Sequence, residues 1–222
     1  MAREPLVIEP RNGQAADAAL ILLHGLGADG SDFEPLVPAL GLPQELALRV
    51  VLPHAPSRPV TVNGGMRMPA WYDILEMDLS RKVDVEQLRA SARSVQALID
   101  AQRDAGIDSR RIIVAGFSQG GAVAYEAALT YPQPLAGLLA MSTYFATGDT
   151  LGVADANQAL EVEVHHGTFD PVVPESLGRA GYDRVRELGL PAHYRTYPMA
   201  HALCPEQIAD IGDWLTRRLS AE

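Results

Sequence analysis

Ser118 lies at the centre of a Gly-x-Ser-x-Gly pattern, Gly-Phe-Ser-Gln-Gly over residues 116–120. An apolar run of strand type, 112–115, precedes the pattern, and a helical pattern starts directly after it at residue 122. Between a strand and a helix this pattern is typical of a nucleophile elbow, a tight and strained turn that raises the serine hydroxyl above the sheet. The glycines two residues before and after the serine relieve crowding in that turn. The sequence therefore predicts Ser118 as a nucleophile for acyl transfer.

A serine nucleophile needs a base and an acid, and two further strand ends supply candidates. Asp170 follows an alternating strand pattern over 161–166, and His201 follows a strand expected over 192–196. The order Ser, Asp, His along the chain is that of α/β-hydrolases. Of six histidines, only His201 follows the last strand and the acid, so we predict Asp170 and His201 as the partners of Ser118. The weaker alternatives are His24, His54, His165, His166 and His193 as the base, and Asp149 and Asp155 as the acid.

A glycine-rich loop, His-Gly-Leu-Gly-Ala-Asp-Gly over 24–30, follows a continuous apolar run at 18–23. It lacks the lysine of a phosphate-binding loop and the glycine spacing of a dinucleotide site. A loop of this kind after an early strand suits an oxyanion loop, whose backbone N–H completes the pair begun at the elbow. We predict Leu26 as that donor and His24 as a structural residue.

Residues 54–78 form a long irregular segment, and long loops in compact domains are usually functional. Their apolar side chains are sufficient to wall an acyl pocket, and the predicted wall consists of Met66, Met68, Trp71, Tyr72 and Leu75, with Phe145 and Val172 added from later loops. A second interpretation carries equal weight for the aromatic residues. Trp71 and Tyr72 could only pin the loop to the core, and Phe145 could be a core residue.

Strand and helix patterns alternate along nearly the whole chain. Strands are expected at 6–8, 18–23, 46–52, 112–115, 135–141, 161–166 and 192–196, and helices at 33–40, 85–105, 122–129, 174–188 and 205–219. Asn12-Gly13 predicts a hairpin-type turn after the first strand. Such alternation predicts a mostly parallel central sheet of about seven strands with helices on both faces, the α/β-hydrolase fold, in one domain over 1–222.

Composition excludes several classes of function. The net charge of −10 argues against binding to nucleic acid or to anionic membranes. No apolar run approaches the ~20 residues that span a bilayer, and no secretory signal is visible, so a cytoplasmic location is expected. The single cysteine, Cys204, excludes an internal disulfide and is expected to fill apolar space. The adjacent His165 and His166 would point to opposite faces of a strand, so we predict neither a metal nor a cofactor.

Five motifs follow one another along the chain: Leu-Leu-His-Gly-Leu-Gly-Ala-Asp-Gly (22–30), Trp-Tyr-Asp-Ile (71–74), Gly-Phe-Ser-Gln-Gly-Gly (116–121), His-Gly-Thr-x-Asp-Pro-Val-Val-Pro (166–174) and Tyr-Pro-Met-x-His (197–201). Together they resemble the small carboxylesterase, acyl-protein thioesterase and lysophospholipase family, from about residue 5 to residue 219, and its bacterial carboxylesterases most of all. The resemblance implies a triad of Ser118, Asp170 and His201. It also implies an oxyanion hole made by the N–H groups of Leu26 and Gln119, and an acyl groove bordered by the 63–80 loop.

The expected activity is hydrolysis of carboxylic esters with short to medium acyl chains through an acyl-enzyme. An acyl-protein thioesterase or a lysophospholipase with the same triad is the alternative. A catalytically silent hydrolase fold used for binding is a remote one. The expected partner is a small-molecule ester or thioester, and the family resemblance allows a monomer or a homodimer.

Overall fold

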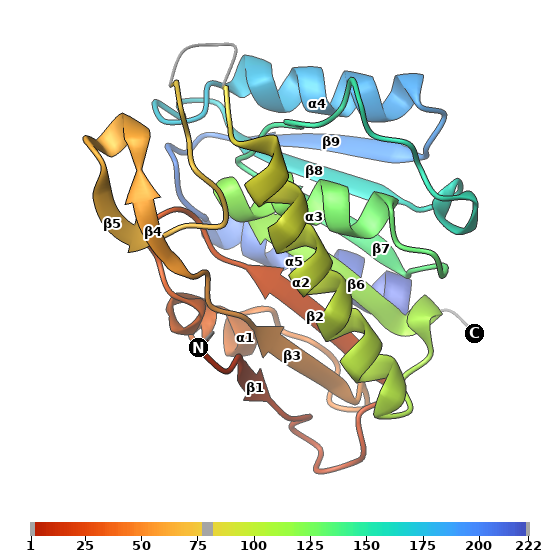
Figure 1. Ribbon diagram of the computed structural model, residues 1–222. Coiled ribbons are helices and arrows are strands. Elements are labelled where there is room, and N and C mark those ends of the chain that lie inside the picture. Colours follow the sequence, from red (N-terminus) through yellow and green to blue (C-terminus); the bar gives the residue numbers. More distant parts are fainter. Residues whose placement is uncertain (1–2, 77–81, 221–222) are drawn as a thin grey trace.

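The computed structural model of the protein describes residues 3–76 and 82–220. Its centre is a seven-stranded sheet in the order β1-β3-β2-β6-β7-β8-β9 (Figure 1). All neighbouring strands are parallel except β1, which pairs antiparallel to β3 at one edge. The mostly parallel sheet predicted from the sequence is confirmed. Its strands are β1 (Leu6–Ile8), β2 (Ala18–Leu23), β3 (Leu48–Leu52), β6 (Ile112–Phe117), β7 (Gly137–Met141), β8 (Val162–Gly167) and β9 (Ala192–Tyr197).

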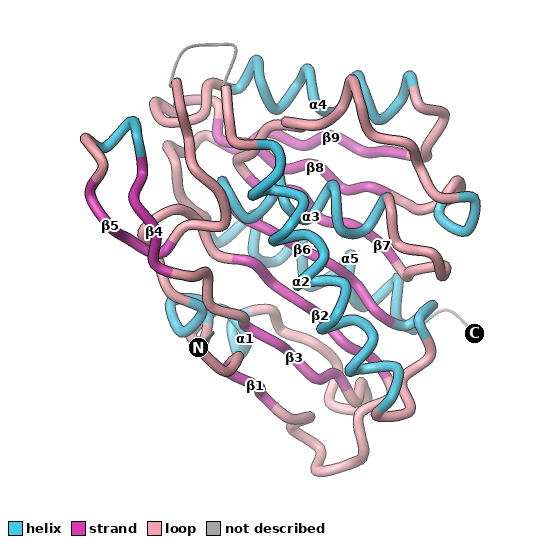
Figure 2. The backbone as a smooth tube through the Cα atoms, viewed as in Figure 1, coloured by secondary structure: helices cyan, strands magenta, loops and turns pink. Residues whose placement is uncertain are grey.

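Helices cover both faces of the sheet, as the backbone trace in Figure 2 shows. One face carries α2 (Val85–Asp104), α3 (Gln119–Leu129) and α4 (Glu175–Glu187), and the other carries α1 (Leu36–Ala39) and α5 (Pro205–Ser220). The described residues also contain four short 3₁₀ turns: η1 (Gly30–Phe33), η2 (Thr61–Asn63), η3 (Ser109–Arg111) and η4 (Asp155–Asn157). Within the described residues, no helix is both long enough and apolar enough to cross a bilayer.

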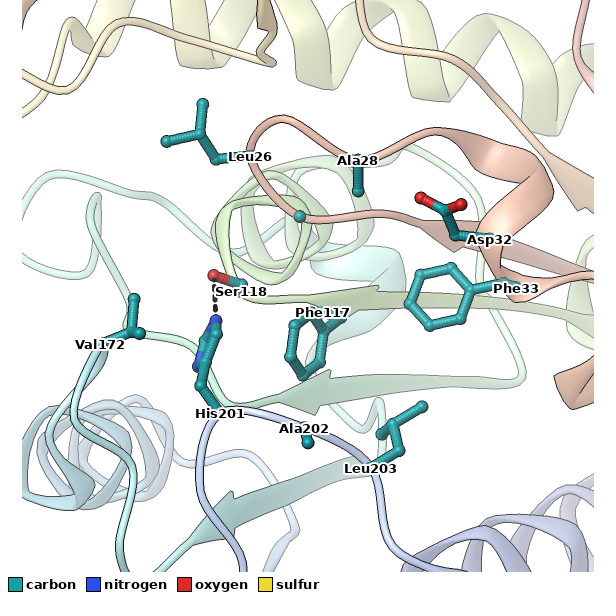
Figure 3. A pocket seen from close by; sticks show the side chains of 11 residues that line it. Leu26, Ala28, Asp32, Phe33, Phe117, Ser118, Val172, His201, Ala202 and Leu203 are labelled. Carbon is teal, nitrogen blue, oxygen red and sulfur yellow. Dashed lines mark hydrogen bonds between the residues drawn. The ribbon is translucent and has the colours of Figure 1, made fainter. Parts of the chain in front are cut away.

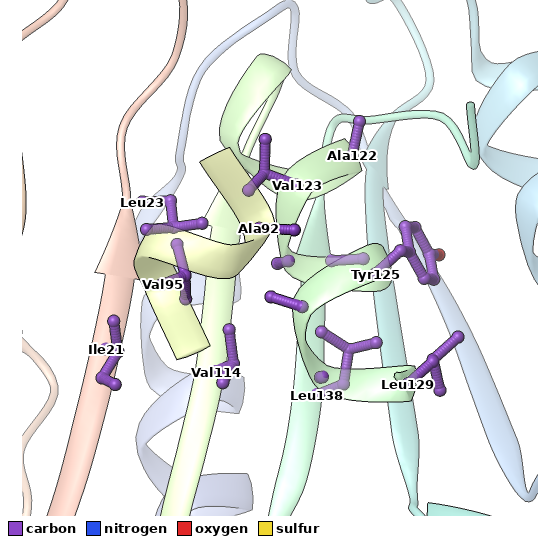
Figure 4. Close-up of a cluster of buried hydrophobic side chains, with 14 of the residues drawn as sticks. Ile21, Leu23, Ala92, Val95, Val114, Ala122, Val123, Tyr125, Leu129 and Leu138 are labelled. Atoms are coloured by element: carbon purple, nitrogen blue, oxygen red, sulfur yellow. The ribbon is translucent and has the colours of Figure 1, made fainter. Parts of the chain in front are cut away.

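The larger core cluster fills the space between the sheet and the α2–α3 layer (Figure 4). All six residues of β2 are buried because helices cover the sheet on both faces, as its continuous apolar run indicates. Helix α2 begins at the cap residue Asp84, whose carboxylate accepts the N–H of Gln87 at 2.9 Å. Helix α3 is buried at all eleven positions, between the sheet and α2. The helix that follows Ser118 is therefore held between the sheet and α2.

Two predictions for the N-terminal third are wrong. The helix expected over 33–40 is a 3₁₀ turn, η1, and a separate four-residue helix, α1. Pro35 and Pro38 each lack an N–H donor, which prevents one continuous helix. The turn at Asn12-Gly13 forms, with Gly13 at φ +68°, yet it closes no hairpin. The strand before it pairs with β3 and not with β2, because β3 lies between them in the sheet.

The irregular loop expected over 54–78 contains an antiparallel hairpin apart from the main sheet. Strand β4 (Ser57–Val60) pairs with β5 (Met66–Pro69), and Gly64 and Gly65 turn the chain with φ of +65° and +77°. Prolines at 59 and 69 obscure the strand pattern in the sequence, but they are tolerated in a two-stranded sheet whose outer edges are unpaired. The predicted 63–80 loop lies partly outside the described residues, at 77–80.

Candidate active site

Ser118 lies between β6 and α3 in the sharp turn that its sequence pattern predicts. Its backbone has φ 53° and ψ −123°, one of two non-glycine residues with positive φ among those described. A Cβ at position 116 would lie 2.6 Å from Gly121 N, and one at position 120 would lie 2.5 Å from His24 O. Only glycine fits at either place. The hydrogen bond from Ser118 N–H to Met141 O, 2.9 Å long, holds the strained residue against β7.

His201 bridges Ser118 and Asp170. Its Nε2 lies 2.9 Å from Ser118 Oγ, and its Nδ1 lies 2.6 Å from Asp170 Oδ2. Because a carboxylate only accepts, Nδ1 carries the proton and Nε2 is left to accept from the serine hydroxyl. The ring also packs on Phe117, with centroids 4.7 Å apart. The structure therefore brings together three residues from three strand ends, at the distances that a nucleophile, a base and an acid require.

Asp170 is almost buried, at 7% exposure, and its carboxylate accepts three hydrogen bonds. The N–H groups of Val172 and Val173 donate to Oδ1 at 2.9 and 2.8 Å, while His201 contacts Oδ2. Burial by itself raises the pKa of Asp170, but the hydrogen bonds from His201 and Val173 outweigh it, so the net shift is downward. The carboxylate therefore stays charged and available to an imidazolium.

Two residues next to Ser118, Leu26 and Gln119, have backbone N–H groups that could bind an oxyanion. Gln119 is the first residue of α3, where an N–H has no acceptor within the helix. The 24–30 loop passes close by, since a Cβ at Gly25 would lie 3.3 Å from Ser118 Cβ, and Leu26 lines the same space. No acceptor for the Leu26 N–H occurs among residues 3–76 and 82–220. This arrangement can hold a tetrahedral oxyanion.

A cavity of about 440 Å³ opens beside Ser118 (Figure 3). It runs between the 25–33 loop and the 201–203 loop, and its wall consists of Gly25, Leu26, Ala28, Asp32, Phe33, Phe117, Ser118, Val172, His201, Ala202 and Leu203. Most of these side chains are apolar, as in sites that bind an acyl chain. Phe33, Phe117 and Leu203 were not predicted as wall residues. Two of them lie within two residues of Ser118 or His201, a proximity that would have indicated them.

Of the seven predicted wall residues, only Val172 lines this cavity. Trp71 and Tyr72 are buried, at 3% and 0% exposure, so the structure supports the second interpretation, in which they pin their segment to the core. Phe145 stacks on Tyr125 with centroids 4.4 Å apart and lines a different cavity beside α4. The other three also lie off the cavity wall: Met66 at 65% exposure, Met68 beside Gly27, and Leu75 bonded through its N–H to Lys82 O.

The other histidines are engaged elsewhere. His24 is fully buried between Gly25 O and the Ala55 N–H, and burial lowers its pKa. His165 contacts Glu163 and Tyr197, whose hydroxyl donates to Asp210 on α5. His166 faces α4, on the opposite side of the sheet, as expected of neighbours in a strand. His54 accepts the Gly30 N–H, and His193 is exposed on β9. The alternative acids lie away from Ser118: Asp149 on the cavity beside α4 and Asp155 in η4.

One group among the described residues has metal-ligand geometry. Donor atoms of Glu161, Glu163 and His193 lie within 4.8 Å of one another, at the amino end of β8 and away from Ser118. The carboxylates are already paired. Arg218 Nη1 lies 3.2 Å from Glu161 Oε2, and Arg195 Nε lies 3.3 Å from Glu163 Oε1. These arginines supply the positive charge that a cation would bring, so the group is an ion-pair network.

Comparison with known proteins agrees with this geometry. The sequence profile described as Phospholipase/Carboxylesterase matches residues 3–219. The chain belongs to the phospholipase/carboxylesterase family. It is 38% identical over 234 residues to acyl-protein thioesterase 1 of Mycosarcoma maydis, covering 98% of each chain. It is 36% identical to acyl-protein thioesterase 1 of Neurospora crassa, covering 99% of this chain and 94% of that one.

The fold of the family is also found in a crystal structure, that of Zea mays acyl-protein thioesterase 2. Its TM-score to this chain is 0.82 at 26% sequence identity, covering 99% of this chain and 100% of that one. The α/β-hydrolase fold predicted from the sequence is thus confirmed. As a member of this family the protein is a serine hydrolase of the acyl-protein thioesterase and carboxylesterase type. The special similarity to bacterial carboxylesterases stays a prediction.

Proposed function

We propose that the protein hydrolyses acyl thioesters, and carboxylic esters of short to medium acyl chains, through a triad of Ser118, His201 and Asp170. The observation that carries the proposal is His201, hydrogen-bonded to Ser118 Oγ at 2.9 Å and to Asp170 Oδ2 at 2.6 Å. A thioester is proposed as the preferred substrate because the relatives at 36–38% identity are named acyl-protein thioesterases. The plain carboxylesterase expected from the sequence becomes the second activity of the same site.

The first half of the reaction forms an acyl-enzyme. Ser118 Oγ attacks the carbonyl carbon while His201 Nε2 takes the hydroxyl proton, and the π electrons of the carbonyl move to its oxygen. The N–H groups of Leu26 and Gln119 hold that oxyanion, and each such donor is typically worth about 3 kcal/mol. The C–S or C–O bond then breaks, and the leaving thiolate or alkoxide takes the proton from His201.

The second half returns the enzyme to its starting state. Water attacks the acyl-enzyme, gives one proton to His201, and a second oxyanion forms in the same place. When it collapses, the bond between the acyl carbon and Ser118 Oγ breaks, and the serine recovers the proton. Asp170 holds the imidazole in its Nδ1–H tautomer throughout, which its lowered pKa and its three hydrogen bonds favour. Every step uses groups of this chain and water.

The cavity beside Ser118 supports an acyl chain as the group bound there. Phe33, Phe117 and Leu203 offer an apolar wall next to the nucleophile, and Phe169 and Val172 near the acid are exposed at 70% and 40%. A lysophospholipid would present the same ester to the same triad and is the second candidate substrate. Small esters, thioesters and lysophospholipids are therefore all included in the test.

The test has two parts. A fluorophosphonate should label Ser118, located by mass spectrometry, and Ser118→Ala should lose label and roughly 10⁵–10⁶-fold in kcat. Absence of an adduct would favour a silent fold used for binding. A panel of p-nitrophenyl esters of graded chain length, an S-acylated peptide and a lysophospholipid then ranks the substrates by kcat/KM. A peptide thioester below the oxygen esters in that ranking would overturn the order proposed here.

Three properties stay predictions from the sequence: the cytoplasmic location, the single domain, and the monomeric or homodimeric state. Size-exclusion chromatography with light scattering measures the last of them directly.

A further inference from the structure

Residues 69–72 lie across both elements that would supply the oxyanion donors. On the side of the 24–30 loop, Pro69 O accepts the Gly27 N–H at 2.8 Å, and Trp71 Nε1–H donates to His24 O at 2.8 Å. These two bonds fall on either side of Leu26 along the chain. The peptide that carries the Leu26 N–H is therefore fixed at both ends by one short segment.

The same segment fixes the second donor through the side chain of Gln119. Trp71 N–H donates to Gln119 Oε1 at 2.8 Å, and Gln119 Nε2 donates to Tyr72 O at 2.7 Å. Gln119 is 1% exposed, so both ends of a buried amide are satisfied by two adjacent peptides. The first residue of α3 is thereby tied to residues 71 and 72, in addition to its place in the helix.

Residues 69–72 are themselves held rigidly. Ser91 Oγ on α2 donates to Trp71 O, and the Ala70 N–H donates to Pro56 O at 3.0 Å. The Trp71 ring is 3% exposed and lies 5.1 Å from the His24 ring, centroid to centroid. The segment is a buried link between α2, the 24–30 loop and the elbow.

We propose that residues 69–72 form a clamp that sets the separation of the Leu26 and Gln119 N–H groups, and that Trp71 is a positioning residue for the oxyanion. The proposal rests on the function proposed above. Both donors must lie within about 2.7–3.1 Å of one oxygen atom that exists only in the transition state. They come from different elements, so their separation depends on whatever bonds to both. Trp71 does so, with its indole N–H on one side and its backbone N–H on the other.

Trp71→Phe tests the clamp, because it keeps an aromatic ring and removes the indole N–H. The matched control is Trp214→Phe, since Trp214 is also buried, at 2% exposure, and donates from Nε1 to Glu161 Oε1 at 2.8 Å, far from Ser118. Gln119→Met is the second test variant; it keeps the backbone N–H of residue 119 and removes both amide bonds. Thermal unfolding first establishes the temperature at which every variant is folded, and all assays run below it.

Each variant is then assayed for kcat and KM with p-nitrophenyl butyrate and for inhibition by an alkyl trifluoromethyl ketone, which adds to the serine as a tetrahedral oxyanion. We expect Trp71→Phe and Gln119→Met to lower kcat about 10- to 100-fold with KM within about twofold, and to weaken the ketone by the same factor. Trp214→Phe should change neither, even if it unfolds at a lower temperature.

Wild-type kcat in both test variants would overturn the clamp, and so would a fall in kcat that the ketone affinity does not follow. A fall of the same size in Trp214→Phe would assign the effect to general destabilisation and would overturn it as well. Failure of the proposed function would give a different set of results. In that case the ketone and the fluorophosphonate leave Ser118 unmodified in the wild-type protein, and Ser118→Ala keeps its activity.

Discussion

His166 lies directly against Asp170, with its Nε2 3.7 Å from Asp170 Oδ2. The same Nε2–H donates to Val173 O at 2.8 Å, and the Val173 N–H donates to Asp170 Oδ1 at 2.8 Å. Nδ1 has no hydrogen-bond partner among the described residues and faces Gly178 on α4. A buried neutral imidazole therefore supports the turn that holds the carboxylate next to His201.

The unfolding free energy should fall with acidification because of this ring. Burial lowers the pKa of His166, so below about pH 6.5 the unfolded chain takes up a proton that the folded chain does not. Stability is full above that pH and declines as pH falls towards the folded-state pKa, with a limiting slope of about 1.4 kcal/mol per pH unit for one ring. His24, also buried with a lowered pKa, adds to the slope.

His166→Gln isolates the contribution of His166, since a glutamine Nε2 can keep the bond to Val173 O without titrating. Urea unfolding at several pH values between about 7.5 and 5 should show a shallower decline for this variant than for the wild type. Val7→Gln, a non-titrating change at an exposed position on β1, is the control and should run parallel to the wild type. Parallel curves for His166→Gln would contradict the assignment.

Gly178→Ala should destabilise the protein strongly. A Cβ at this position would lie 2.8 Å from His166 Cε1 and closer still to Nδ1, so either α4 or the ring must move. Overpacking of this kind typically costs about 1–3 kcal/mol. Gly181→Ala is the control on the same helix, because its Cβ would meet its nearest neighbour, Phe145 Cβ, at 3.5 Å.

At position 181 the gain in helix propensity, up to about 1 kcal/mol, should dominate. Urea unfolding of the two variants should therefore move in opposite directions from the wild type. Since the ring at 166 supports Asp170, Gly178→Ala should also lose kcat, whereas Gly181→Ala should keep it. Equal stabilities would show that α4 adjusts freely over His166.

Local sequence patterns predict the elbow and the strand ends well, because both depend on residues close together in the chain. Gly116 is required by contacts with Gly120 and Gly121 in the same turn, and the apolar run of β2 follows from burial on both faces. Asp170 and His201 follow from the rule that parallel strands present their carboxyl ends at one edge. These local patterns were sufficient to predict the candidate triad and the fold class.

The cavity and the role of residues 69–72 could not be predicted in the same way. An apolar composition does not tell whether Trp71 faces a cavity or the core, and its partner Gln119 lies 48 positions along the chain. Phe33 and Leu203 meet only when two loops converge beside Ser118. The hairpin β4–β5 was hidden by the prolines within it. Each of these features depends on contacts between distant segments.

Backbone strain at Ser118, the proposed nucleophile, predicts an unusual order of stabilities at this position. With φ 53° and ψ −123°, a residue with a Cβ is strained by about 1–3 kcal/mol, and glycine relieves it. Against this, glycine lowers the free energy of unfolding by roughly 0.4–1 kcal/mol, because it gives the unfolded chain more conformational freedom. Ser118→Gly should therefore unfold at higher urea than Ser118→Ala, by about 1 kcal/mol, although both lose the bond to His201.

Ser176, exposed in the first turn of α4, provides the comparison. There alanine should be more stable than glycine by up to about 1 kcal/mol, the usual helix order. The reversal between positions 118 and 176 is the diagnostic result. The same order at both positions would mean that the turn relaxes when the serine side chain is removed.

Leu203 should set the length of acyl chain that the cavity accepts. It lies at the end of the cavity away from Ser118, across from Phe33 (Figure 3). Leu203→Trp should fill that end and exclude about two methylene groups, each worth about 0.8 kcal/mol. The ratio of kcat/KM for octanoyl over acetyl p-nitrophenyl esters should then fall about 10-fold, with the acetyl ester little affected.

Met66→Trp is the control for this prediction. Met66 is 65% exposed on the hairpin and off the cavity wall, so the same ratio should stay unchanged. A uniform loss with every ester would instead mean that the bulky side chain displaces His201, two residues away, and that another surface binds the acyl chain.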